Sequence, residues 1–115
     1  MPLLKLETTA VLADEQRAAL LASLSTLVAE TIGKPETYVM VIINPAAIQM
    51  SGASGDAAFV DVRSIGGLNR DVNRKLSERA CALLHESLGI PVERIYLNFT
   101  DVSAGNWGWK GGTFG

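Results

Sequence analysis

An internal repeat constrains this chain most, because its two halves follow one plan with a shift of 56 positions. Under this shift Gly33 aligns with Gly89, and Pro35 aligns with Pro91. Each of these glycines follows a stretch with helical spacing of apolar residues, where glycine ends a helix and proline prevents its continuation. A strand-like segment precedes each predicted helix and another follows it. The repeat therefore predicts a duplicated β-α-β unit.

The predicted elements form one domain over residues 1–115, with units at about 2–45 and 57–101. They are strands at 2–8, 38–43, 57–62 and 94–100, a helix that Asp14 caps and Gly33 ends, and a helix from about 69 to 88. The buried face predicted for the first helix is Leu20, Leu24, Leu27, Val28 and Thr31, and one face of the second is Val72, Leu76, Ala80, Leu83 and Ser87. Each crossover makes its two strands parallel and should be right-handed. We predict an α/β (α+β) fold, a four-stranded mixed sheet with two helices on one face.

The other face of this predicted sheet has no helix to cover it. Residues 38–43 are apolar at every position, so both faces of that strand require burial. An exposed apolar patch usually marks an interface, and we therefore predict a homo-oligomer in which the sheets face inward. Within the strand at 94–100, Tyr96, Asn98 and Thr100 share one face. These polar residues would lie at or near a subunit boundary, where small-molecule sites are common.

Composition and charge narrow the function. The net charge is −2 and the basic residues are scattered, so no field attracts nucleic acid or anionic lipid. Cys81 is the only cysteine and His85 the only histidine, which excludes an internal disulfide and a thiolate zinc cluster and leaves a catalytic triad unsupported. Residues 1–12 lack the features of a signal peptide, and no window has the ~18 apolar residues of a membrane span. We expect a cytoplasmic protein without membrane insertion.

The chain begins Met1-Pro2, and the nitrogen of Pro2 is a candidate catalytic group. Initiator methionine is usually removed before a small residue such as proline, and the mature chain would then start with a secondary amine. An N-terminal amine titrates near ~8, and burial or a nearby cation lowers that pKa. A neutral amine can act as a base or a nucleophile. The alternative is that Pro2 is only a tolerated residue after the start codon.

The last ten residues, 106–115, are rich in glycine and carry Trp107, Trp109 and Phe114. Large aromatic side chains are costly to expose in such a segment. They could pack on a partner subunit, line a pocket, or belong to the ordinary core.

These features together resemble the tautomerase superfamily, most closely the macrophage migration inhibitory factor and D-dopachrome tautomerase family. The resemblance covers essentially the whole chain. It rests on Met1-Pro2, Thr31-Ile32-Gly33-Lys34-Pro35, Ser64-Ile65-Gly66, Arg94-Ile95-Tyr96-Leu97-Asn98, and Asn106-Trp107-Gly108-Trp109 with Thr113-Phe114 near the end. It implies a homotrimer with three sites at subunit boundaries. It also implies keto–enol tautomerisation of 2-oxo acids of the phenylpyruvate type, or of D-dopachrome-like compounds, without cofactor or metal.

The resemblance also assigns residue roles. Pro2 would be the base that moves a proton between carbon and oxygen, and Lys34 would bind the substrate carboxylate and lower the pKa of Pro2. Ile65 would contact substrate through its backbone, and Tyr96 and Asn98 of a neighbouring subunit would donate hydrogen bonds. The apolar wall would consist of Tyr38, Trp107, Trp109 and Phe114. Each also has a plain structural interpretation: Lys34 as a surface residue at a helix end, for example.

Two other functions stay open at this level. One is a cytokine-like protein that binds a receptor and would leave the cell without a leader sequence. The other is a related reaction, decarboxylation or dehalogenation through hydration, which the resemblance associates with extra arginines and an acidic residue. Arg63 and Arg70 lie near the Ser64-Ile65 segment, without a clear acidic partner.

Overall fold

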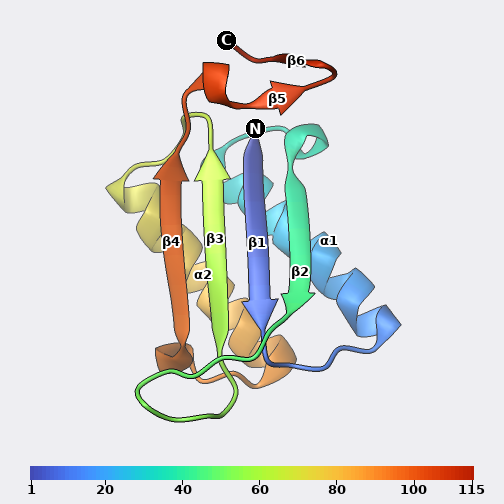
Figure 1. Ribbon diagram of the computed structural model, residues 1–115, viewed down its shortest axis with the longest axis vertical. Coiled ribbons are helices and arrows are strands. Elements are labelled where there is room, and N and C mark those ends of the chain that lie inside the picture. Colours follow the sequence, from blue (N-terminus) through green and yellow to red (C-terminus); the bar gives the residue numbers. More distant parts are fainter.

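Four strands form one sheet in the order β2-β1-β3-β4 in the computed structural model, which describes residues 1–115. The elements are β1 (Pro2–Thr8), α1 (Asp14–Ile32), β2 (Met40–Pro45), β3 (Ala58–Ser64), α2 (Arg70–Leu88), β4 (Ile95–Asp101), β5 (Gly108–Trp109) and β6 (Gly112–Thr113). The pairs β1–β2 and β3–β4 are parallel, and the central pair β1–β3 is antiparallel. Both helices lie behind the sheet (Figure 1). The predicted duplicated β-α-β unit and mixed sheet are confirmed.

Local sequence signals explain where the helices end. Gly33 and Gly89 follow α1 and α2 with φ of 77° and 69°, a left-handed conformation that glycine adopts without strain. Their backbone N–H groups donate to the carbonyls of Ala29 and His85. Asn69 caps α2, because its side chain accepts a hydrogen bond from the N–H of Val72 at 2.9 Å.

Several predicted boundaries were wrong. The second strand is Met40–Pro45 rather than 38–43, the third begins at Ala58 rather than 57, and the fourth is Ile95–Asp101 rather than 94–100. Asp14 does not cap α1: Ala13 holds the cap position without a side-chain bond, and Asp14 pairs with Arg17 at 2.9 Å. Tyr38 lies in a short 3₁₀ turn and not in a strand. Pro35 starts this turn, and its carbonyl accepts a hydrogen bond from the N–H of Tyr38 at 3.1 Å. The third strand extends to Ser64, because it pairs with β1 along all of its seven residues.

The helix faces differ slightly from the predicted ones. In α1 the last buried residue is Ile32 rather than Thr31, whose hydroxyl accepts from Arg79 at 3.0 Å. In α2 the buried row is Leu76, Ala80 and Leu84, whereas Leu83 is half-buried and Ser87 exposed. The core cluster combines these helix residues with the alternate residues of the strands, among them Leu4, Leu6, Val60 and Val62.

The open face of the sheet is less apolar than residues 38–43 alone predict. Met40 is 61% exposed there, but in β1 and β3 this face carries Lys5, Asp61 and Arg63 beside apolar residues. Asp61 and Arg63 form an ion pair at 3.0 Å. Tyr96 is exposed on the same face, as the alternation of β4 predicts. No helix in the chain combines the length and apolar character that a membrane span requires.

Candidate functional site

A pocket of about 550 Å³ opens at the end of the sheet where β1 begins. In Figure 1 the C-terminal segment with β5 and β6 lies directly beyond the N-terminus at this end. The pocket is lined by Met1, Pro2, Leu3, Thr37, Tyr38, Val39, Met40, Arg63, Val102, Asn106, Trp107, Gly108, Trp109 and Phe114. Its volume falls within the range of small-molecule sites, and most of its lining is apolar.

Pro2 lies in this pocket as the first residue of β1, with a side chain less than 2% exposed. A proline is tolerated at the start of a strand because it has no N–H to donate to the ladder. It lies opposite Ser64 of β3, whose hydroxyl donates to the carbonyl of Gly66 at 2.7 Å. The strand pairing therefore fixes Pro2 at the sheet end rather than on a free tail.

The surroundings of the pocket lower the pKa of the chain's terminal amine. In this structure that amine belongs to Met1, and the nitrogen of Pro2 is an amide nitrogen. Burial, and then the positive charge of Lys34, lowers the pKa of the Met1 amine below its ordinary value of 8.0. Both causes act at the pocket end of β1, where the Pro2 amine would lie after removal of Met1.

Lys34 follows the C-terminal glycine of α1, and its N–H donates to the carbonyl of Ala29 at 3.1 Å. Its side chain is half-buried and does not line the pocket of the single chain. It lies close to Gly67: a Cβ added to that glycine would approach Lys34 Cε at 3.3 Å and Ile32 Cγ2 at 2.7 Å. Lys34 therefore places a positive charge near the amine, beside the residues that line the pocket of the single chain.

Three aromatic residues form a packed wall. The rings of Trp109 and Phe114 stack with centroids 5.5 Å apart, and Tyr38 meets Trp109 edge-on at 6.3 Å. The backbone supports this arrangement, because the N–H of Phe114 donates to the carbonyl of Trp107 at 3.1 Å. Trp107 is half-buried and also lines the pocket. All four aromatic residues named from the sequence therefore meet at one place, which gives an apolar environment for a ring.

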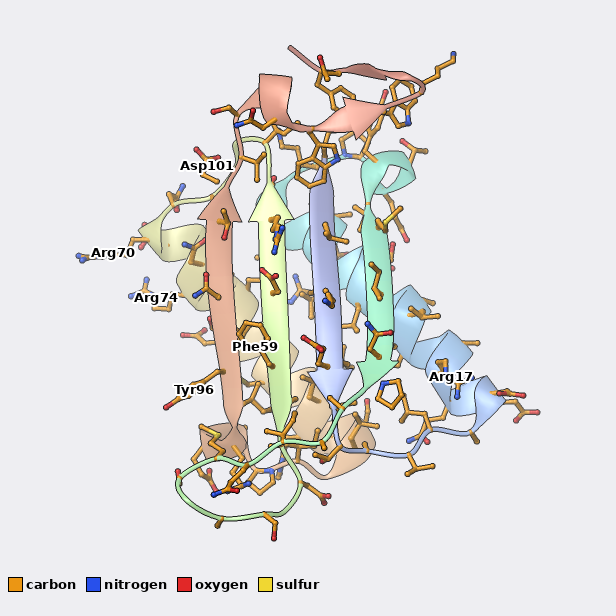
Figure 2. All side chains as sticks on the ribbon, viewed as in Figure 1. Arg17, Phe59, Arg70, Arg74, Tyr96 and Asp101 are labelled. Carbon is orange, nitrogen blue, oxygen red and sulfur yellow. The ribbon has the colours of Figure 1, made fainter.

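Ile65, Tyr96 and Asn98 lie outside this pocket. Ile65 is half-buried in the turn after β3, where Asp101 accepts a hydrogen bond from the N–H of Gly66 at 3.0 Å. Tyr96, 67% exposed, and Asn98 are on the open face of β4. Figure 2 shows Tyr96 near the start of that strand and Asp101 at its other end. The single chain therefore does not bring this pair to Pro2.

Sequence reasoning did not name Arg63 as a pocket residue for the favoured reaction, yet it lines the pocket. The alternation of side chains along β3 could have indicated this role, because it places Arg63 and Asp61 on the same face of the strand. Arg70, considered with it for the related reactions, is exposed at the start of α2 and points outward in Figure 2. Asp61 is the acidic partner of Arg63 that the sequence alone did not reveal.

The remaining reactive residues lie elsewhere. Burial raises the pKa of the Cys81 thiol, which disfavours its thiolate form. Ring nitrogen Nδ1 of His85 lies 3.0 Å from the carbonyl of Ile90 near the end of α2. No group of three or more His, Cys, Asp or Glu side chains is arranged to hold a metal ion. The N-terminal pocket is therefore the candidate site.

Fold and pocket together define a class of small proteins with duplicated β-α-β units, in which the second residue, a proline, closes an aromatic pocket. The chain belongs to the macrophage migration inhibitory factor family, whose model matches residues 1–115. It is 36% identical over 107 residues to the macrophage migration inhibitory factor of Xenopus tropicalis, covering 92% of this chain and 93% of that relative.

Solved structures agree with this assignment. A macrophage migration inhibitory factor-like protein from Entamoeba histolytica superimposes with a TM-score of 0.94 at 32% identity, over 98% of both chains. The homologue from Prochlorococcus marinus gives 0.92 at 38% identity, over 98% of this chain and 99% of the other. The predicted family and its fold are confirmed.

Proposed function

We propose that this chain is a cofactor-free keto–enol tautomerase for 2-oxo acids of the phenylpyruvate type, with Pro2 as its general base after Met1 is removed. The observation that carries the proposal is the place of Pro2: buried at the start of β1 and lining an aromatic pocket. The lowered pKa of the Met1 amine at this end supports it, because the same causes favour a neutral Pro2 amine.

The proposed reaction is a 1,3-proton transfer. The neutral Pro2 nitrogen takes a proton from the carbon next to the keto group, a carbon–carbon double bond forms, and the carbonyl electron pair moves to oxygen. The Pro2 ammonium then delivers its proton to that oxygen, which gives the enol and regenerates the base. Trp109, Phe114 and Tyr38 would hold the aromatic ring of the substrate, with Trp107 limiting the width of the pocket. This wall also excludes water and keeps the amine neutral.

The proposal includes a homotrimer that completes the site. Tyr96 and Asn98 are exposed on the open sheet face and absent from the pocket of their own chain, as expected if they serve a neighbour. There they would donate hydrogen bonds to the substrate oxygen, where negative charge develops. Ile65 would contact substrate through its backbone. Light scattering combined with size-exclusion chromatography measures the assembly, and a monomeric mass would contradict this part.

The test compares phenylpyruvate conversion by two preparations of checked intact mass, one starting at Pro2 and one retaining Met1. We expect activity in the processed form and little in the other, because a retained Met1 makes the Pro2 nitrogen an amide. Equal activity in both would move the base elsewhere. Inactivity of both would favour the alternative, a cytokine-like protein whose partner is a receptor.

Lys34→Ala is expected to weaken carboxylate-bearing substrates selectively. One lost charge-assisted contact would lower kcat/KM for a 2-oxo acid by about 10- to 100-fold. The methyl ester of the same acid lacks the negative charge and should lose much less. Steady-state kinetics on the acid and its ester measure the difference, with Lys75→Ala, which removes an exposed lysine of α2, as the matched control. Equal losses for acid and ester would show that Lys34 does not bind the carboxylate.

A further inference from the structure

Arg63 is the only residue with a charged side chain among the fourteen that line the pocket. It comes from β3 and points to the open face of the sheet, whereas Lys34 follows α1 on the helix side. In the strand register Leu3 is directly opposite Arg63 and Pro2 is the next residue along β1. The pocket therefore has a cation at its wall, close to the proposed base.

The guanidinium of Arg63 is only partly engaged. Its Nε and Nη2 donate to the same oxygen, Asp61 Oδ2, at 3.3 and 3.0 Å, and its other N–H groups have no acceptor within the chain. The side chain is 54% exposed. Because a guanidinium has five donors in a planar fork, the free ones can bind a carboxylate through two hydrogen bonds. Asp61 is only 18% exposed and holds the Nε side of the guanidinium, so the N–H groups of Nη1 and the second N–H of Nη2 remain for another carboxylate.

We propose that Arg63 binds a second anionic group, so that the pocket also takes 2-oxo acids with two carboxylates and favours them over aliphatic monocarboxylates of the same chain length. This rests on the proposed function for the first carboxylate and the base. Asp61 stays on the Nε side of Arg63 as its counter-anion, and the second carboxylate of the substrate binds the N–H groups that Asp61 leaves free. Arg63 then sets the preference for substrate charge, and the negative charge of Asp61 beside it weakens that preference.

The experiment uses two five-carbon probes, 2-oxopentanedioate and 2-oxopentanoate, of which the first has a terminal carboxylate where the second has a methyl group. Exchange of their C3 protons in D₂O, followed by NMR at fixed ionic strength, gives kcat/KM for each. Arg63→Gln is expected to lower the ratio of the dicarboxylate to the monocarboxylate value about tenfold, the size of one charge-assisted contact. Asp61→Asn is the matched variant, because it breaks the same ion pair yet frees the guanidinium. It should leave the ratio at the original value or raise it.

A lower ratio in Arg63→Gln together with an unchanged or higher ratio in Asp61→Asn would support the inference. A fall in the ratio with both would mean that the ion pair itself matters, and this would overturn it. An equal loss for both probes in Arg63→Gln would also overturn it, because Arg63 would then act on the carboxylate that the probes share.

Calorimetric titration with each probe separates this inference from the proposed function. Normal exchange with a ratio that Arg63→Gln leaves unchanged would reject the Arg63 role and leave the tautomerase intact. Absence of exchange, with dicarboxylate binding that Arg63→Gln weakens about tenfold more than monocarboxylate binding, would reject the tautomerase and keep the anion site.

Discussion

Replacing Pro2 by alanine in the processed chain is expected to lower kcat/KM for phenylpyruvate tautomerisation by about 10²- to 10⁴-fold, the usual contribution of a positioned acid–base group. Alanine keeps a terminal amine but loses the ring that fixes the nitrogen. It also leaves space where the buried proline side chain closes the pocket. A primary amine that rotates freely and is better hydrated is a poorly positioned base with a more ordinary pKa.

The pH dependence of the same reaction gives a second readout. A base acts in its neutral form, so kcat/KM rises with pH and levels off above the pKa of the free amine. Burial and Lys34 lower the pKa of the Met1 amine, and the same causes would act on a Pro2 amine, so the midpoint is expected below the ordinary pKa of an N-terminal proline. In the Pro2→Ala variant the remaining activity should have its midpoint at higher pH, because a better hydrated amine holds its proton more strongly.

Pro45→Ala is the matched control. It removes a proline at the end of β2, which pairs with Thr8 at the opposite end of β1 from Pro2. Its tautomerase activity and oligomeric state should match those of the unchanged chain, and Pro2→Ala should also keep the oligomeric state. Unchanged turnover in Pro2→Ala would reject Pro2 as the base.

Much of the fold could be predicted because it depends on patterns that repeat locally. Two glycine–proline helix ends at a fixed shift, together with four strand-like segments, were enough for the duplicated unit. The predicted strand boundaries are wrong where a single turn or a single strand pairing determines the end of the element. Tyr38 is apolar enough for a strand, but the turn that Pro35 starts holds it. Ser64 joins β3 because β1 is seven residues long and pairs throughout.

The site could be predicted less completely, for a physical reason. Pro2 and the aromatic residues carry their own chemistry, and the sequence singles them out wherever they fold. Arg63 has a role only through its neighbours: the strand alternation that turns it to the open face, the register that sets it by Leu3, and its ion pair with Asp61. Tyr96 and Asn98 remain predictions for the assembled protein, since no contact within one chain tests them.

Leu24→Ala is expected to have the largest effect on stability, a loss of about 2–5 kcal/mol in the free energy of unfolding. Leu24 is completely buried in α1 and belongs to the core cluster that includes Leu4 and Leu6 of β1. Truncation removes apolar contacts and leaves a cavity that the close-packed sheet and helices fill only in part. The equivalent position of the second repeat is Ala80, so the repeat offers no second leucine there.

Leu21→Ala is the control for this measurement, since it makes the same substitution three residues earlier at a half-buried position of α1. It should cost about 1 kcal/mol, because less surface returns to water and no closed cavity forms. Urea unfolding of all variants at one protein concentration measures the losses, since the apparent stability of an oligomer rises with concentration.

Leu4 and Leu6 alternate with Lys5 along the strand that Pro2 begins, so the core that Leu24 completes also supports the strand that carries the proposed base. Equal losses for the two leucines would show that burial in α1 does not follow the observed helix face. That result would also remove the core packing of α1 as the support of β1.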